Sequence, residues 1–383
     1  MKKLFFSLLA SLLFSCVRIY AQAWTWQNPL PTGNDLHAIA IYDYSDLAYA
    51  VGNNGTIIKT SDAGLNWSAL NSGTTERLND IFVPSSATAY AVGPGGTIMK
   101  TTDAGNTWIK LNFGYNTYLS SVHFISENIG LIAGYDGKIY KTISGGLTWT
   151  GLTTGTTEKI QSIRFFGSQI GYAVGDNGLI LKTTNGGSTW ERLLSGVYHR
   201  LNAVFFPSTN IGYAVGGNAA GEKILLKTID GGDFWTYVTF NDGTLTQFSD
   251  VYFINNTTGF ITGSVGFIKK TTDGGNTWTD IPTDYRAPTY IQFSGSNKGI
   301  AVGPQGGIYK TADGGNTWGA YSNMSHLHSV FFPEANTGYV VGNQGTILKT
   351  TDGGISWNNT LSGEDYILYS IFFPFPSLPP PPP

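Results

Sequence analysis

The feature that most constrains this chain is an internal repeat. Each copy ends in a tryptophan, and successive tryptophans are 39 to 45 residues apart. The eight tryptophans are Trp67, Trp108, Trp149, Trp190, Trp235, Trp278, Trp318 and Trp357. A period near 40 residues is typical of β-propeller blades, in which each blade buries its faces only against its neighbours. The length of 383 residues therefore does not set a domain count in the usual way.

Each repeat is predicted to hold four short strands. In the second repeat they cover 78–83, 89–92 and 97–101, and the fourth begins at Trp108. The segments between them are rich in Gly, Pro, Asn and Asp, which are turn residues. No segment keeps a period of 3.6 residues, so we expect essentially no helix in the mature chain. The sequence predicts an all-β fold, a β-propeller of four-stranded blades, and its eight repeats favour eight blades.

The best-defined element is the turn between the third and fourth strands, as in 101–108 (Thr-Thr-Asp-Ala-Gly-Asn-Thr-Trp). The Asp side chain can accept hydrogen bonds from backbone N–H groups of its own turn, and the Gly permits a backbone conformation that a Cβ would oppose. We assign a structural role to this position and to the eight tryptophans. The residues at the Asp position are Asp62, Asp103, Ser144, Asn185, Asp230, Asp273, Asp313 and Asp352. Ser144 and Asn185 can also accept a turn hydrogen bond.

The motif Ser/Thr-x-Asp-x-Gly-x-Thr-Trp resembles the Asp-box, or bacterial neuraminidase repeat. The full unit, as in 171–190, is most similar to the repeat of the photosystem II stability and assembly factors, and the chain resembles a secreted bacterial relative of them. The resemblance covers roughly residues 24–373. It implies a propeller that binds partner proteins through one face. Because the resembling assembly factors have seven blades, a seven-bladed ring is the alternative to eight.

The two ends of the chain do not follow the repeat. Residues 1–23 carry Lys2 and Lys3, then an apolar stretch and small residues suited to cleavage, as in a secretory signal peptide. Cys16, the only cysteine, is removed with this peptide unless it accepts a lipid. Residues 24–373 form the predicted propeller, and 374–383 are a Pro-rich tail expected to be disordered. We therefore expect an exported protein that is extracellular, periplasmic or at the cell surface.

The predicted binding surface is the rim formed by the loops that join one blade to the next and by the loops between second and third strands, called the loop rim below. The Asp-box turns lie on the opposite rim, called the turn rim. Loops that vary on a rigid scaffold are the usual place for binding function. The residues at or beside one such position in the second to eighth predicted blades are Arg77, Tyr118, Lys159, Arg200, Gln247, Arg286 and His326.

Composition and motifs favour an interaction module over an enzyme. Removal of Lys2, Lys3 and Arg18 with the signal peptide takes the formal charge from −3 to −6, which gives no basis for binding nucleic acid. No catalytic residues, cofactor or metal site are indicated, and we expect a monomer with a protein or glycan partner. The alternative is an extracellular glycoside hydrolase, xyloglucanase- or sialidase-like. Its candidate carboxylates, Glu76 and Glu158, lie in near-identical loops, which indicates inherited loop sequence.

Overall fold

The computed structural model describes residues 32–42, 45–218, 220, 222–240, 247–263, 267–281, 288–304 and 307–320. It also describes the strand segments 327–331, 337–342, 347–351 and 358–359 of the last repeat. The predicted signal peptide (1–23) and the Pro-rich tail (374–383) lie outside the described residues. So do Arg286, His326, Asp352 and Trp357 among the predicted site and structural residues.

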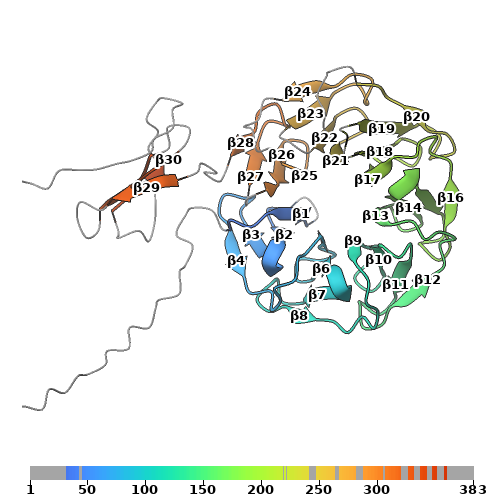
Figure 1. Ribbon diagram of the computed structural model, residues 1–383, viewed down its shortest axis with the longest axis horizontal. Helices are drawn as coiled ribbons and strands as arrows, with labels where there is room; N and C mark the ends of the chain where they lie inside the picture. The colour runs from blue at the N-terminus through green and yellow to red at the C-terminus, as the bar shows by residue number, and fades with distance from the viewer. Residues whose placement is uncertain are drawn as a thin grey trace, which may run out of the picture.

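Seven antiparallel four-stranded sheets form a ring, with the first strand of each sheet innermost (Figure 1). We number these blades 1 to 7 in chain order. Blades 1 to 3 are β1 (Leu36–Ile41), β2 (Ala48–Gly52), β3 (Ile57–Thr60), β4 (Ser68–Leu70); β5 (Asp80–Phe82), β6 (Ala89–Gly93), β7 (Thr97–Thr101), β8 (Ile109–Lys110); and β9 (Leu119–Phe124), β10 (Gly130–Gly134), β11 (Ile139–Thr142), β12 (Thr150–Leu152).

Blades 4 to 7 continue the same order around the ring. They are β13 (Ile160–Phe166), β14 (Ile170–Gly175), β15 (Ile180–Thr183), β16 (Glu191–Leu193); β17 (Arg200–Phe205), β18 (Gly212–Gly217), β19 (Lys223–Thr228), β20 (Thr236–Tyr237); β21 (Phe248–Phe253), β22 (Gly259–Gly263), β23 (Phe267–Thr271), β24 (Thr279–Ile281); and β25 (Tyr290–Ser294), β26 (Lys298–Val302), β27 (Ile308–Thr311), β28 (Gly319–Ala320).

The ring closes between blades 7 and 1, so the preference for eight blades was wrong and the seven-bladed alternative holds. Strand β1 packs against β25 and β26. The N–H of Leu36 donates to the carbonyl of Gly303 at 3.0 Å, and the N–H of Ile41 donates to the Gln292 side chain at 2.6 Å. These contacts cover the faces of blades 7 and 1 that an eighth blade would need. The eighth repeat instead forms a sheet drawn beside the ring in Figure 1, with strands β29 (Leu327–Phe331), β30 (Gly338–Gly342), β31 (Ile347–Thr350) and β32 (Asn358–Asn359).

The predicted strands of the second repeat form, with small shifts at their ends. Strand β5 is shorter than predicted, since it covers 80–82 and not 78–83. The helical elements given below are short 3₁₀ turns between second and third strands, in agreement with the prediction of almost no helix. They are η1 (Asn53–Gly55), η2 (Pro94–Gly96) and η3 (Asp176–Gly178).

The Asp-box turns are stabilised by side-chain hydrogen bonds to their own backbone. In blade 2, Asp103 Oδ1 accepts from the Thr107 N–H at 2.9 Å and from the Thr101 hydroxyl at 2.8 Å. The replacement Ser144 accepts from a backbone N–H at 3.0 Å in the same way. Gly105 has a φ of +87°, and a Cβ there would come within 3.0 Å of the neighbouring blade. A residue with a Cβ is therefore strongly disfavoured at this position.

Each Asp-box also holds the preceding blade in place. The ammonium of Lys100 in β7 donates to the carbonyl of Gly145 in the next box at 2.8 Å, and the Tyr90 hydroxyl donates to the same carbonyl at 2.8 Å. Lys59 and Lys141 make the equivalent contacts one blade earlier and one blade later. The repeat thus encodes the contact between blades as well as the blade itself.

Candidate functional site

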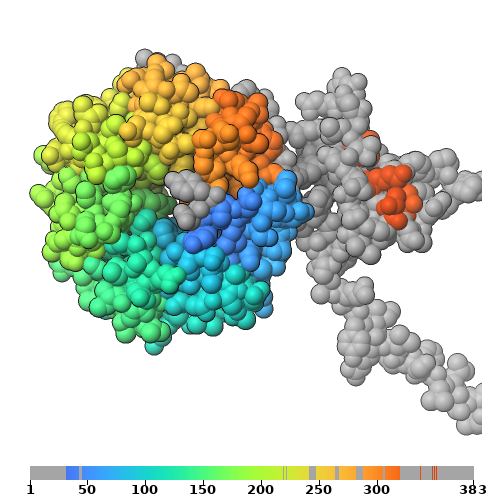
Figure 2. Space-filling model, turned by 180° about the vertical axis from the view of Figure 1, so that it is seen from behind, coloured from blue at the N-terminus to red at the C-terminus, as the bar shows by residue number. Residues whose placement is uncertain are grey.

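Several of the predicted binding residues open onto the central channel of the ring. It has a volume of about 880 Å³ and is lined by the first strands of all seven blades, β1, β5, β9, β13, β17, β21 and β25. The space-filling view from behind shows the blades as consecutive sectors around this hollow (Figure 2). A ring of first strands gives every blade one or two side chains at the axis, so the channel lining can differ at each of seven positions.

The structure gathers most of the predicted loop-rim residues at the mouth of this channel. Arg77, Tyr118, Arg200 and Gln247 all line the cavity, together with Tyr135 from a loop between second and third strands. Lys159 is not among the lining residues, but its ammonium lies 5.1 Å from the ring centre of Tyr135.

Blades 3, 4 and 5 are joined at the mouth by a polar network. Arg200 donates to Gln161 Oε1 at 2.8 Å and lies 3.7 Å from the carboxylate of Asp176. Gln161 in turn donates to Asp176 at 2.9 Å and lies 3.2 Å from the Tyr135 hydroxyl, which donates to it. The Arg200 guanidinium is about half exposed and keeps a face toward solvent. The network fixes its direction, so it is prepared to bind without further ordering of its side chain.

Beside this network lies an aromatic pair. The rings of Tyr118 and Tyr135 stack with centroids 4.2 Å apart and planes 20° from parallel. The Tyr118 hydroxyl donates to Asn79 Oδ1 at 3.0 Å, which ties the pair to blade 2. Stacked tyrosines give a rigid, amphipathic surface of the kind found in binding sites.

Arg77 lies on the blade 1 side of the mouth. Its guanidinium is 3.5 Å from Nδ1 of His37, whose Nε2 is 2.7 Å from Asn53 Oδ1. Burial lowers the pKa of His37, the hydrogen bond to Asn53 opposes this, and the charge of Arg77 lowers it further. A neutral His37 leaves Arg77 as the cation on this side of the mouth at neutral pH.

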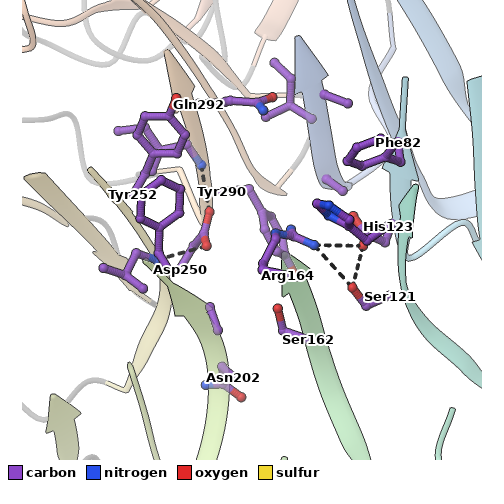
Figure 3. Close-up of a pocket in the computed structure, with 18 of the residues that line it drawn as sticks. Phe82, Ser121, His123, Ser162, Arg164, Asn202, Asp250, Tyr252, Tyr290 and Gln292 are labelled. Atoms are coloured by element: carbon purple, nitrogen blue, oxygen red, sulfur yellow. Dashed lines mark hydrogen bonds and ion pairs between the residues drawn. The ribbon is translucent and has the colours of Figure 1, made fainter. Parts of the chain in front are cut away.

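Below the mouth lies the level of the channel that contains Asp80, Arg164 and Asp250, called the waist here. An ion pair crosses this level between blades 2 and 4 (Figure 3). Nη1 of Arg164 lies 3.6 Å from the carboxylate of Asp80 and 3.3 Å from the Ser121 hydroxyl, which itself donates to Asp80 at 2.8 Å. The N–H groups of Ile81 and Val122 also donate to Asp80, both at 2.9 Å. Asp80 is almost fully buried, and these partners satisfy its carboxylate oxygens.

A second carboxylate, that of Asp250 in β21, lies across the waist from Arg164 (Figure 3). It accepts from the N–H of Val251 at 2.9 Å and from the N–H of Ile291 at 3.2 Å. Burial raises the pKa of Asp250 to about 6, against the opposing effects of Arg164 and of the two backbone bonds. The neighbouring Tyr290 has its pKa raised to about 12, first by burial and then by the charge of Asp250.

His123 is the remaining titratable group of the waist. It lies between Phe82 and Phe165, with ring centres 4.5 Å and 5.5 Å away. Burial, and then the charge of Arg164, lower its pKa to about 3. His123 is therefore neutral at physiological pH and adds no charge to the channel.

The waist residues were not predicted from the sequence, although a signal was present. At one equivalent position of the first strand, defined by its pairing with the second strand, the seven blades carry Ala38, Asp80, Ser121, Ser162, Ala203, Asp250 and Tyr290. An aspartate within an otherwise apolar strand has to be solvated or paired. The sequence interpretation treated the first strands only as apolar core, so Asp80, Arg164 and Asp250 were missed.

The carboxylates considered for hydrolysis are not brought together in the channel. Neither Glu76 nor Glu158 lines it, and Glu158 accepts a hydrogen bond at 2.7 Å from the exposed Asn177. Within the described part of the chain, no group of three or more His, Cys, Asp or Glu side chains is placed to hold a metal ion. No helix in the same part is long and apolar enough to cross a bilayer.

Seven four-stranded blades, repeated Asp-boxes and a lined axial channel define the class of Asp-box β-propellers. Within this class, a family model for the photosynthesis system II assembly factor YCF48 matches residues 110–197 and 196–326. These two segments cover more than half of the chain, so the chain belongs to the YCF48 family. No curated protein sequence matches it.

Solved structures share the fold at low sequence identity. A structure of YCF48 bound to D1 peptide has a TM-score of 0.63 at 18% identity and covers 74% of this chain and 95% of its own. YCF48 from Cyanidioschyzon merolae has a TM-score of 0.62 at 20% identity, with 76% and 98% covered. A GH74 enzyme from Niastella koreensis has a TM-score of 0.64 at 16% identity, with 88% and 68% covered. These similarities show a common fold, and function has to be argued from the site.

Proposed function

We propose that the chain is an exported, non-catalytic interaction module that binds a protein partner through the loop rim at the mouth of the channel. Membership of the YCF48 family supports an interaction role, since one YCF48 is known with a bound D1 peptide. The identity of that peptide is not carried over to this chain. What is carried over is the use of a propeller to hold a segment of another protein.

The observation that carries the proposal is the contrast between the two rims. On the turn rim, the box side chains repeat the same bonds in blade after blade, as Asp273 and Asp313 do with Thr277 and Thr317. On the loop rim, equivalent positions hold a guanidinium, a stacked tyrosine, an ammonium and an amide, and all of these except the ammonium line one opening. Only the second arrangement has enough variation to recognise one partner among many.

The proposal is tested by selecting ligands for the mature chain from a displayed random-peptide library and from a glycan array in parallel. Selected ligands should then be measured against a triple variant, Arg77→Ala, Arg200→Ala and Arg286→Ala. We expect peptides to be selected and the triple variant to lose at least tenfold in affinity with a nearly unchanged melting temperature.

A matched control changes charge on the turn rim. The variant Asn106→Lys with Asn316→Lys adds two charges beside Asp-box turns and should leave binding unchanged. If binding survives the arginine changes but is lost in this control, the partner binds the turn rim and the proposal of the loop rim is wrong. Selection of glycans in place of peptides would show that the partner class is wrong.

Glycoside hydrolysis is the second candidate, because two carboxylates in different surroundings share the channel. Asp80 is paired with Arg164, while burial raises the pKa of Asp250 to about 6, and carboxylates in unlike surroundings are used as acid–base pairs in glycosidases. The burial of Asp80 beneath Arg164 opposes a direct role in attack on a sugar. Reducing-sugar release from xyloglucan that disappears in Asp250→Asn would favour the hydrolase, and no release from the wild-type chain would remove it.

A further inference from the structure

The waist of the channel holds an unbalanced set of charges. It contains two carboxylates, Asp80 and Asp250, and one guanidinium, that of Arg164. His123 is buried between aromatic rings and contributes no charge at neutral pH. The other cations among the described lining residues are Arg77 and Arg200 at the mouth, and Arg200 is already paired with Asp176. One negative charge at the waist is therefore left without its own counter-ion.

The geometry assigns this excess charge to Asp250. Nη1 of Arg164 is directed to Asp80 and Ser121, and it also donates to the Ile163 carbonyl at 2.9 Å. Among the described residues the structure records no ion pair for Asp250, whose two recorded hydrogen bonds come from backbone N–H groups. Backbone N–H groups orient a carboxylate but do not neutralise it.

The surroundings of Asp250 suit a flat or elongated cation. Tyr252, Tyr290 and Gln292 line the channel together with Asp250 and are labelled near it in the close-up (Figure 3). The Tyr252 hydroxyl donates to the Phe293 carbonyl at 3.2 Å, which fixes its ring. Aromatic faces next to a carboxylate attract ammonium and guanidinium groups by cation–π interactions as well as by charge.

We propose that the waist binds one positively charged side chain, a lysine or an arginine, that the protein partner inserts through the channel mouth, with Asp250 as its counter-ion. This rests on the proposed function, since it names the group of the partner that enters below the loop rim. The inserted cation completes a set of two carboxylates and two cations across the waist. A carboxylate inserted by the partner would instead have to pair with Arg164, which would then have to leave Asp80.

The test uses small probes that need no knowledge of the partner. N-acetyl-lysine methylamide and N-acetyl-arginine methylamide are titrated into the mature chain at pH 7.5 and followed by NMR. The neutral N-acetyl-citrulline methylamide and the anionic N-acetylglycine serve as controls. We expect the two cationic probes to bind in the millimolar range and the two controls not to bind.

Three variants separate a cation site from an anion site. Asp250→Asn should weaken binding of the cationic probes at least tenfold. Arg164→Met should strengthen it, because Asp80 and Asp250 would then both lack a counter-ion. Asp233→Asn removes the carboxylate of an exposed side chain on the turn rim and should change nothing. A melting curve for each variant identifies any that does not fold, and Asp250→Ser then replaces Asp250→Asn.

The proposal is overturned if N-acetylglycine binds and loses its affinity in Arg164→Met, or if the wild-type chain binds neither cation. It is also overturned if Asp250→Asn binds the cations as well as the wild type does. Each of these results leaves the peptide-selection test of the loop rim untouched. A failure of the waist site is therefore distinguishable from a failure of the proposed function.

Discussion

Replacing Trp108 by alanine removes a large aromatic side chain from the boundary between blades 1 and 2. The Trp108 side chain is 8% exposed and meets the ring of Tyr49 edge-on, with centroids 6.1 Å apart at 82°. Truncation of a buried tryptophan costs about 3–5 kcal/mol. Since 1 kcal/mol shifts the melting temperature of domains of 150 to 250 residues by about 2–4 °C, we expect a fall of roughly 6 °C or more.

Asp103→Asn in the same turn should be far milder, although it removes a charge. Asn185 occupies this position in blade 4, where its Oδ1 accepts from the N–H groups of Ser188 and Thr189, both at 3.0 Å. Its Nδ2 donates to the Thr189 hydroxyl, whereas in blade 2 the Thr107 hydroxyl donates to Asp103. Reversing one hydroxyl therefore restores the network.

Thermal melts at pH 7, followed by circular dichroism, compare these two variants with the wild type. Asp103→Ala is the matched control for loss of the acceptor, and it should fall between the other two. If Asp103→Asn melts below Trp108→Ala, the turn and not the aromatic packing between blades dominates stability, and the reasoning fails.

Four further predictions follow from the same contacts. Backbone and side-chain donors lower the pKa of Asp62, Asp103 and Asp273 to about 2, below the unfolded value near 3.9. The contribution of these carboxylates to stability is therefore present above pH 4 and is lost as the pH falls towards 2. Thermal melts between pH 5 and pH 2 should show this loss of stability, and a flat profile would contradict it. Burial raises the pKa of Asp250 to about 6, so its ionised form destabilises the fold above that pH. The free energy of unfolding of Asp250→Asn should exceed that of the wild type by up to about 3 kcal/mol at pH 7.5 and should equal it at pH 4. A variant that is less stable than the wild type at pH 7.5 would contradict this prediction. Lys141→Met should lower the melting temperature, because Lys141 donates to the Gly186 carbonyl at 2.8 Å and to Ser188 at 3.0 Å in the next blade, and an unchanged melt would mean that this contact between blades does not stabilise the ring. Deletion of residues 1–23 should leave the chain in the cytoplasm while the full chain is exported and cleaved, as fractionation and N-terminal sequencing would show, and recovery of an uncleaved cytoplasmic full chain would contradict it.

The repeating part of the structure was predictable because local chemistry determines it. The turn at 101–108 specifies its own hydrogen bonds, and the strands on either side follow from turn residues at a regular spacing. The blade number was not predictable in this way. Each repeat specifies the same contact with a neighbour, so the number that closes the ring depends on how Leu36 and Gly303 meet, and no single repeat encodes that.

The channel site was not predicted for a related reason. Periodicity shows which strand is innermost, but Asp80, Arg164 and Asp250 come from blades 2, 4 and 6, and they meet only because seven strands surround one axis. Their sequence separations of 84 and 86 residues give no local pattern to recognise. The single local signal was an acidic residue in the interior of a strand, which an apolar interpretation of that strand leaves unexplained.

The chain has to fit its blades together and also to recognise a partner, and these two requirements fall on different parts of the ring. At the outside, Asp-boxes and tryptophans have to be nearly identical, since every blade must fit the next one; Gly105 and Gly146 allow no Cβ for this reason. At the axis the first strands are free to carry different side chains, even where these bond across blades, as Ser121 does to Asp80. Asp250 illustrates this freedom, because its raised pKa indicates a cost to stability that the packing of blades does not require. An acidic residue that costs stability, at the axis where side chains differ from blade to blade, is best explained by binding, which is why the channel and its mouth, and not the turn rim, are where a partner should be sought.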